Sequence, residues 1–196
     1  MGFPMAGHLS DSGHEVSVYN RTSNKSEEWE SKFKGKAYKS PREAAIGADF
    51  VMACVGNDDD LREICLGEDG AFKGMKPGTI FVDHTTVSAK VTRELANISK
   101  GSGVEFIDAP VSGGDVGARN KSLVVMVGGE EEAFHRGEPL LQQMGQSVTR
   151  LGPAGSGQRC KLSNQIAVAI GMVAWCEALA VAKASNLDPS AVQDVI

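Results

Sequence analysis

The chain is poor in aromatic residues and has no excess of positive charge. Only 6% of its 196 residues are aromatic, and 25 acidic residues against 20 basic ones give a formal net charge of −5. Nucleic-acid recognition relies on basic surface for the phosphates and often on aromatic side chains that stack on bases. The composition therefore argues against nucleic acid as a main partner.

Cysteine and leader-like segments are also scarce. The four cysteines form no Cys-x-x-Cys pair or other zinc-type spacing, which predicts free thiols in a reducing compartment and no metal site. The N-terminus lacks the basic and apolar segments of a secretory signal. No apolar run approaches the length of a membrane span. We therefore expect a cytoplasmic protein with no membrane partner.

What the chain does have is a regular alternation of apolar runs and helix-like segments. Strands are expected at 15–20, 50–55, 79–83, 103–108, 122–127 and 147–151. Helices are expected at 1–13, 25–33, 41–47, 59–65, 88–100 and 130–144. This alternation predicts an α/β fold with a Rossmann-like, doubly wound, mostly parallel sheet. Because the chain opens on a helix, we expect the sheet to lack its first strand.

The pattern changes after the glycine-rich stretch 152–157. One long helix is expected from Lys161 to about Ala184, and another begins after Asp188-Pro189. No strand interrupts this part. The sequence therefore predicts a dinucleotide-binding domain over 1–153 and the beginning of an all-helical domain over 154–196.

Two residues near the N-terminus suggest a cofactor. Gly2 fits the third glycine of a G-x-G-x-x-G turn, whose first two glycines would precede residue 1. The next predicted strand ends in Asn20-Arg21, where an NAD-binding fold usually carries an acidic residue for the ribose hydroxyl. An arginine there can pair with a 2′-phosphate, which favours NADP. The alternative is a solvated turn with an incidental arginine.

Polar residues concentrate in two further segments. Lys161, Asn164 and Gln165 stand at i, i+3 and i+4, so they share one face if the segment is helical. The following residues, 166–170, are apolar enough for a buried helix. Lys161 is therefore either snorkelling at a helix end or held in a polar pocket. Together with the glycine-rich run 108–114, this segment indicates a small-molecule site in an enzyme.

These segments resemble the motifs of one enzyme family. Residues 108–114 read Asp-Ala-Pro-Val-Ser-Gly-Gly, and Gly155, Gly157, Lys161, Asn164 and Gln165 match a G-x-G-x-x-x-K-x-x-N-N/Q pattern. Met1, Gly2 and Met5 match the M-G-x-x-M end of a cofactor motif. In order and spacing the chain is similar to the 3-hydroxyacid dehydrogenases, the group of 3-hydroxyisobutyrate dehydrogenase and tartronate semialdehyde reductase.

The resemblance implies hydride transfer between a nicotinamide and a small 3-hydroxy acid or semialdehyde. Lys161 would transfer the proton, which requires a pKa lowered by burial. The substrate would be held by Asn164 and Gln165, and its carboxylate by Ser112, Gly113 and Gly114. Asp108 itself is expected to be a turn or cap residue rather than a catalytic acid.

The resemblance also implies a set of cofactor-binding residues, with NADP preferred and NAD possible. These are Met1, Gly2, Asn20, Arg21, Thr22, Val55, Gly56, Asp60, Thr85 and Thr86. Val55-Gly56 departs from the Leu-Pro that the family often has, and the three acids 58–60 that follow are expected to cap a helix.

Alternatives remain beside this interpretation. The family has a first strand before Gly2 and a longer helical domain after Ile196, and its full-length members are expected to form homo-oligomers. The chain could therefore be an inactive or fragmentary dinucleotide-binding module that acts in protein association. A 6-phosphogluconate-type dehydrogenase is a further alternative, because Arg119 and Lys121 follow the substrate loop and could meet a phosphorylated substrate.

Overall fold

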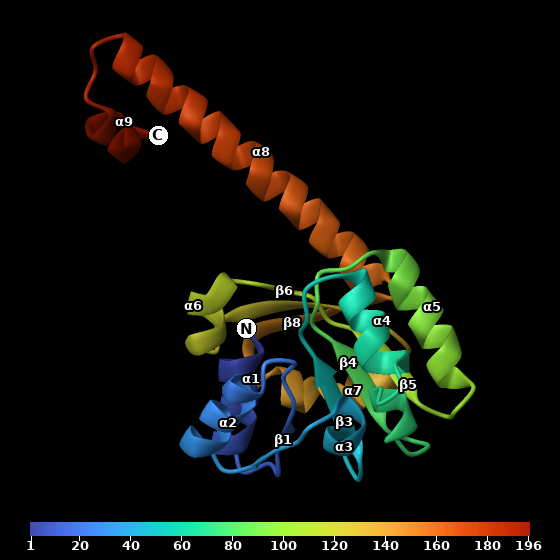
Figure 1. Cartoon of the computed structure of the whole chain (residues 1–196). Coiled ribbons are helices and arrows are strands. Elements are labelled where there is room, and N and C mark those ends of the chain that lie inside the picture. Colours follow the sequence, from blue (N-terminus) through green and yellow to red (C-terminus); the bar gives the residue numbers. More distant parts are fainter. The chain divides into compact units, whose positions relative to one another are not determined.

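Helices and strands alternate along most of the computed structural model, which describes residues 1–196 (Figure 1). The chain divides into two compact units, Met1–Lys161 and Leu162–Ile196. The elements of the N-terminal part are α1 (Gly2–Asp11), β1 (Ser17–Val18), α2 (Ser23–Lys32), β2 (Lys36–Ala37) and α3 (Pro41–Ala45). The strands β1 and β2 pair in parallel as a two-stranded sheet, with no hydrogen-bonded pairing to the other strands.

The larger sheet contains six strands and is surrounded by helices. Its elements are β3 (Phe50–Ala53), α4 (Asp58–Leu66), the 3-10 turn η1 (Ala71–Lys73), β4 (Ile80–Asp83), α5 (Ala89–Lys100), β5 (Glu105–Asp108), β6 (Val111–Ser112), α6 (Gly114–Arg119), β7 (Leu123–Gly128), α7 (Glu131–Leu141) and β8 (Gly145–Gly152). After them come α8 (Ser156–Ala184) and α9 (Pro189–Val195).

The sheet is mixed, so the expectation of a mostly parallel sheet needs correction. Strands β3, β4 and β5 are parallel, but β7 runs antiparallel to both β5 and β6 and parallel to β8. The connection from β5 to β7 holds only the short β6 and α6, and it does not form a helical crossover. A reversal of direction is the result that such a connection allows.

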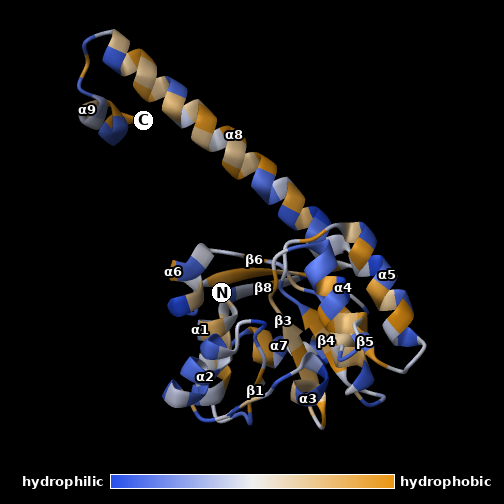
Figure 2. Ribbon diagram, in the orientation of Figure 1, coloured by the Kyte–Doolittle hydropathy of each residue, from blue (hydrophilic) through white to orange (hydrophobic).

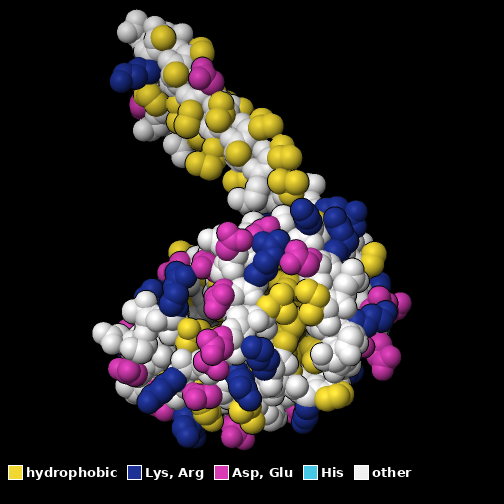
Figure 3. Space-filling view, turned by 45° about the vertical axis from the view of Figure 1, so that its right-hand side comes forward, with side chains coloured by type: hydrophobic (Ala, Val, Ile, Leu, Met, Phe, Trp, Pro, Cys, Tyr) yellow, Lys and Arg dark blue, Asp and Glu magenta, His cyan; other side chains and the backbone are white.

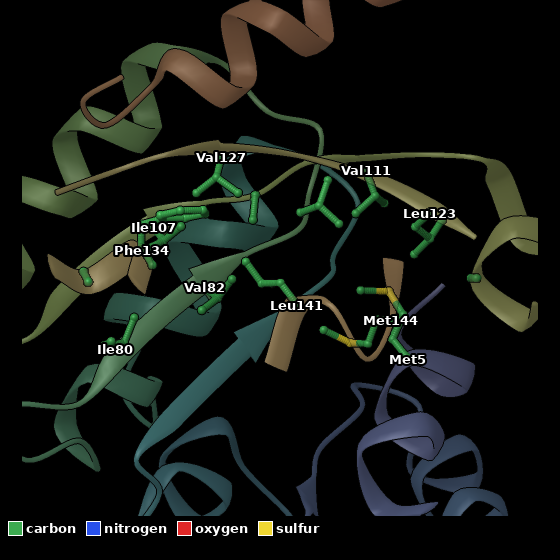
Figure 4. Packing of buried hydrophobic residues seen from close by; sticks show 14 residues of the cluster. Met5, Ile80, Val82, Ile107, Val111, Leu123, Val127, Phe134, Leu141 and Met144 are labelled. Carbon is green, nitrogen blue, oxygen red and sulfur yellow. The ribbon is translucent and has the colours of Figure 1, made fainter. Parts of the chain in front are cut away.

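Helices cover both faces of the central strands. On β4, Ile80 and Val82 pack in one buried cluster and Phe81 packs in another, and all three are fully buried. The first cluster also takes Phe134 and Leu141 from α7 (Figure 4), and the second contains residues of α4 and α5. Alternate residues of a parallel strand point to opposite faces, which explains its continuous apolar sequence. Figure 2 shows this as orange central strands.

The second unit consists of most of α8 and of α9, and its apolar side chains are exposed. Ile166 is 54% exposed and Ile170 is 64% exposed, so the expected burial of 166–170 does not occur in this chain. Hydrophobic side chains line the helix in the space-filling view (Figure 3). A helix that is apolar on most sides normally packs against other elements.

Helix α8 also bears on one expectation from the sequence. It is long enough and apolar enough to cross a membrane by length and composition, with a mean hydropathy of 1.8 over its best 18-residue window. The expectation concerned uninterrupted apolar runs, and the longest of these, residues 166–176, is shorter than a membrane span. The average over the helix is high because Glu177 is the one charged residue between Ile166 and Ala182. The core helix of a soluble protein passes the same test.

Candidate active site

The carboxyl ends of three parallel strands meet at one edge of the sheet. The register places Ala53 beside Asp83 and Asp83 beside Asp108. In open α/β sheets, ligands bind at this edge, in the loops that follow the strands. The sequence-predicted residues Val55, Thr85 and those around Asp108 all follow these strand ends directly.

The first two of these loops are joined by a hydrogen bond. The backbone N–H of Val55 donates to Oγ1 of Thr85 over 3.0 Å, and the backbone N–H of Thr85 donates to Asp83 over 2.9 Å. Gly2 lies close to the end of β3, since a methyl group on it would sit 3.7 Å from Cβ of Cys54. The predicted cofactor residues Gly2, Val55 and Thr85 therefore belong to one region of the fold.

Arg21 is the second feature of the predicted cofactor region. Its guanidinium, in a side chain that is 82% exposed, donates to Asp60 over 2.8 Å. Asn20 donates from its side chain to the carbonyl of Thr22, which precedes α2. The structure thus brings Arg21 and Asp60, which are 39 residues apart, into direct contact.

The acids at 58–60 were expected to cap a helix, but they occupy the first turn of α4 instead. The cap itself is the preceding Asn57, whose side chain accepts the backbone N–H of Asp60 over 2.8 Å. Negative charge in a first turn is favoured by the helix dipole. Asp58 turns to the next helix instead, because it accepts both the backbone N–H and the hydroxyl of Ser88.

Asp108 anchors the start of α8. Its carboxylate accepts the backbone N–H of Gly155 over 2.7 Å and that of Gln158 over 2.9 Å. The side chain is completely buried, and burial raises its pKa even though these N–H groups favour the charged form. The expectation of a capping role for Asp108 is confirmed. Asp108 and Gly155, whose N–H it binds, are 47 residues apart in the sequence.

Two glycines give Asp108 its space. A methyl group on Gly128 would lie 2.4 Å from Oδ1 of Asp108, and one on Gly157 would lie 2.9 Å from Oδ2. Gly157 also faces the carbonyl oxygen of Met126, which would be 2.3 Å from such a methyl group. The second glycine of the G-x-G pattern is therefore required by close backbone packing.

Lys161 follows this anchored turn by one helical turn. It is only 7% exposed, and burial lowers the pKa of its ammonium group from the ordinary value. No ion pair neutralises it in the structure. The direction of this pKa shift is the one that proton transfer near neutral pH requires.

The remaining predicted substrate residues belong to two different units and are described within each. Ser112 is half-buried in β6, and it is followed by Gly113 at φ +128° and Gly114 at φ +62°. Both glycines are exposed, and a methyl group on Gly114 would meet nothing within 4 Å. In the second unit, the side-chain amide of Asn164 donates to that of Gln165 over 3.1 Å.

Comparisons with known proteins decide the family. Residues 1–152 match the NAD binding domain of 6-phosphogluconate dehydrogenase, and residues 155–196 match the NAD-binding region of NADP-dependent 3-hydroxyisobutyrate dehydrogenase. An uncharacterized oxidoreductase of Shewanella frigidimarina is 47% identical over the whole chain, which covers 67% of that protein. The chain belongs to the 3-hydroxyisobutyrate dehydrogenase-like family. The resemblance inferred from its motifs is therefore confirmed.

Two further relatives of this dehydrogenase-like chain have assigned names. The 2-hydroxy-3-oxopropionate reductase of Escherichia coli is 34% identical over the whole chain, which covers 66% of it. The 3-hydroxyisobutyrate dehydrogenase of Mycobacterium tuberculosis, whose structure was solved with L-serine, has a TM-score of 0.93 at 31% identity. The match covers 100% of this chain and 66% of that one. The chain thus spans about two thirds of the length of these relatives.

Sequence reasoning missed three buried polar residues of this dehydrogenase-like chain. Asp83 and His84 lie at the end of β4, and Gln158 lies in the first turn of α8; none is more than 3% exposed. Nδ1 of His84 lies 2.8 Å from the carbonyl oxygen of Ala109 and must donate, because a carbonyl only accepts. The strand-end position of His84 gives no sequence signal for such a partner.

Asp83 and His84 have pKa values that move in opposite directions. Burial raises the pKa of Asp83 to about 7 and lowers that of His84 to about 4. The Asp83 contribution to stability is complete below the ordinary pKa of 3.8 and is lost as the pH rises toward 7. The His84 contribution is complete above 6.5 and is lost as the pH falls toward 4. Between about pH 4 and 6.5, the stability contribution of Asp83 therefore falls with rising pH while that of His84 rises.

We expect Asp83→Asn to reveal how His84 makes the free energy of unfolding depend on pH. The asparagine can still accept from the backbone N–H of Thr85, and it has no charge to bury. Between about pH 4 and 6.5, the free energy of unfolding of the variant should rise by about 3 kcal/mol more than that of the unsubstituted chain. Urea denaturation at several pH values measures this, with the exposed Asp69→Asn as control. Parallel curves for Asp83→Asn and the unsubstituted chain would contradict the assignment.

Proposed function

We propose that this chain is an NADP-preferring oxidoreductase that transfers a hydride between nicotinamide and a small 3-hydroxy acid or its semialdehyde. The observation that carries the proposal is buried Lys161, one turn after a helix start that Asp108 anchors. Family membership supports the reaction class. The geometry adds a titratable amine beside the sheet edge where α/β proteins bind ligands.

The residues at this edge fit a dinucleotide. Helix α1 has no side-chain cap at Met1, and its first turn presents the backbone N–H groups of Gly2 and Phe3, where a phosphate is favoured. Gly2 permits close approach, and the exposed fork of Arg21 suits a 2′-phosphate. We assign the cofactor to these residues together with Asn20, Thr22, Val55, Gly56, Asp60, Thr85 and Thr86. When bound, its nicotinamide supplies or accepts the hydride.

Lys161 would transfer the proton at the reacting oxygen. In reduction, its protonated Nζ donates to the carbonyl oxygen of the substrate. In oxidation, its neutral Nζ accepts the proton of the substrate hydroxyl. Burial lowers the pKa of Lys161, so both protonation states become accessible closer to neutral pH than for an exposed lysine.

The substrate we propose is small and carries a carboxylate. The backbone N–H groups of Gly113 and Gly114 can approach an anion without steric hindrance, and Ser112 adds a hydroxyl donor. Asn164 and Gln165 would orient the reacting end. The L-serine with which the Mycobacterium tuberculosis dehydrogenase was solved is a carboxylate with a hydroxyl on its third carbon, which is the same chemical class.

A second candidate is a dinucleotide-binding module that acts in protein association, and one observation favours it. The second unit exposes large apolar side chains such as Met172, which is 65% exposed. The same surface fits the homo-oligomer that we expect of the full-length protein. A match of residues 155–196 to a dehydrogenase model favours this explanation over a membrane span. Cofactor binding without turnover would support the association module.

A 6-phosphogluconate-type substrate is less well supported. It would need free basic residues after the substrate loop. Arg119 is engaged there, because its guanidinium donates to Asp115 over 2.7 Å. Arg21 has a carboxylate partner of the same kind in Asp60, so the pairing alone does not decide. The Asp-Ala-Pro-Val-Ser-Gly-Gly sequence of the loop at 108–114 favours the small-acid group.

The cofactor proposal predicts a selective effect of Arg21→Asp. Charge-assisted hydrogen bonds to the 2′-phosphate would be lost and replaced by repulsion, so the affinity for NADPH should fall by about 10- to 100-fold. NADH lacks this phosphate, so its affinity should change little. Fluorescence titration of both cofactors measures the difference.

Arg42→Asp is the matched control for this titration, because it is the same charge reversal at an exposed arginine outside these residues. We expect its affinity for both cofactors to equal that of the unsubstituted chain. An equal loss of NADPH and NADH binding in Arg21→Asp would contradict the NADP assignment. Absence of binding of either cofactor would contradict the proposed function.

A further inference from the structure

Gln158 is the polar side chain with the most buried connections near Lys161. It is 3% exposed, and its side-chain amide bonds in both directions. Nε2 donates to the carbonyl of Thr85 over 2.7 Å, and Oε1 accepts the backbone N–H of Val87 over 3.2 Å. Its own backbone N–H donates to Asp108. One residue thus connects the start of α8 with two positions of the loop after β4.

This loop has no regular structure of its own. Residues 84–88 lie between β4 and α5 and make no helical or strand pairing. Loop backbone that is buried must find partners elsewhere, or its polar groups remain unsatisfied. Gln158 supplies one donor and one acceptor to this loop. An amide side chain offers both groups without any dependence on its protonation state.

The connection continues to the neighbouring strand end. Thr85, whose carbonyl binds Gln158, accepts through its hydroxyl the backbone N–H of Val55. The chain of bonds therefore runs from α8 through Thr85 to the loop after β3. Lys161 lies three residues after Gln158 on the same helix.

We infer that Gln158 is a positioning residue that holds the cofactor loop Thr85–Val87 in register with the helix turn that carries Lys161. The inference rests on the proposed function, because that function assigns Thr85 and Thr86 to the cofactor and Lys161 to proton transfer. Gln158 does not touch the reacting atoms in this assignment. It fixes the distance between the two groups that must act together, and such placement has large effects on rate.

The test uses two substitutions of similar size. Gln158→Met removes both side-chain hydrogen bonds but keeps an unbranched chain. Gln158→Glu can accept from Val87 but, when ionised, cannot donate to Thr85. When protonated, it regains a donor. Asp108, which accepts the backbone N–H of residue 158, favours the protonated form of a new glutamate, and Lys161, three residues later on the same helix, favours the ionised form. Gln142→Met, at an exposed position in the same unit, is the control.

The first measurement is amide hydrogen exchange without cofactor. In Gln158→Met, the Val87 amide should exchange about tenfold faster or more, because it has lost its acceptor. The amides of the central strand β4, which is paired on both sides, should be unchanged and report on global stability. Gln142→Met should leave both unchanged. Unchanged exchange at Val87 in Gln158→Met would overturn the inference.

The second measurement is the affinity for NADPH and, where turnover is seen, its pH profile. Gln158→Met should weaken NADPH binding about tenfold. Gln158→Glu should be weak at about pH 8 and should recover toward the unsubstituted chain at about pH 6, as its carboxyl takes a proton. A general loss of structure would also speed exchange in the central strand β4, whereas a positioning role lowers NADPH affinity and leaves β4 exchange unchanged. Unchanged NADPH affinity in Gln158→Met would overturn the inference. If the unsubstituted chain binds no NADPH, the proposed function fails. Exchange at the Val87 amide then still shows whether Gln158 holds this loop.

Discussion

Lys161→Met should abolish turnover and leave cofactor affinity nearly unchanged. Methionine keeps an unbranched chain of similar length, so the packing around this buried position is retained. The proton donor is lost, and general acid–base catalysis contributes about 10²- to 10⁴-fold in rate. Steady-state oxidation of 3-hydroxyisobutyrate or L-serine with NADP⁺, and reduction of a small carboxylate-bearing semialdehyde with NADPH, measure the loss. Lys183→Met, at an exposed position on the same helix, should retain full activity.

The pH profile gives a second readout for the same residue. Oxidation needs neutral Lys161, so its rate should rise with pH. Reduction needs protonated Lys161, so its rate should fall with pH. Because burial lowers the pKa, both transitions should lie below the ordinary value of 10.5. Retention of turnover in Lys161→Met, with the same pH profile as the unsubstituted chain, would rule out the proposed role.

The order of the elements could be predicted because local patterns carry it. Residues 79–83 form an apolar run after a Pro-Gly turn, and β4 occupies Ile80–Asp83. Ser40-Pro41 predicted a helix start, and the Ser40 hydroxyl accepts the backbone N–H of Glu43 there. These features depend on neighbours in sequence, so the sequence alone is enough to find them.

Strand direction could not be predicted in the same way. Strand β7 is buried on both faces, and its apolar run looks the same whether its neighbours are parallel or antiparallel. Strand β2 contains only Lys36 and Ala37, which is too short for any periodicity. Direction and short pairings are set by tertiary packing, so they appear only in the structure.

The candidate site shows the same division. Glycines 155 and 157 and Lys161 could be found from their spacing, because a motif is local. The partner of Arg21 and the two partners of Gln158 are 39 to 73 residues away in sequence. Such pairings depend on how loops from different strands meet, and no local pattern encodes them. The sequence left two environments open for Lys161, a helix end from which it snorkels and a polar pocket. In the structure its side chain is buried.

Gly157→Ala should destabilise the chain strongly, although it adds only one methyl group. The new Cβ would lie 2.3 Å from the carbonyl oxygen of Met126 and 2.9 Å from the carbonyl oxygen of Asp108. Both are backbone atoms of buried strands, so neither can move away as a flexible side chain would. Overpacking of this kind costs about 1–3 kcal/mol, and displacement of the Asp108 cap adds to it.

Gly137→Ala is the matched control, because it is also a buried helical glycine of the first unit. Its methyl group would lie 3.6 Å from Ile107, which is an ordinary contact, and alanine favours the helix by up to about 1 kcal/mol. Urea denaturation should therefore show a lower midpoint for Gly157→Ala and an equal or higher one for Gly137→Ala. Equal midpoints for the two variants would show that the start of α8 can shift away from Met126. In that case the anchored turn could not fix the position of Lys161.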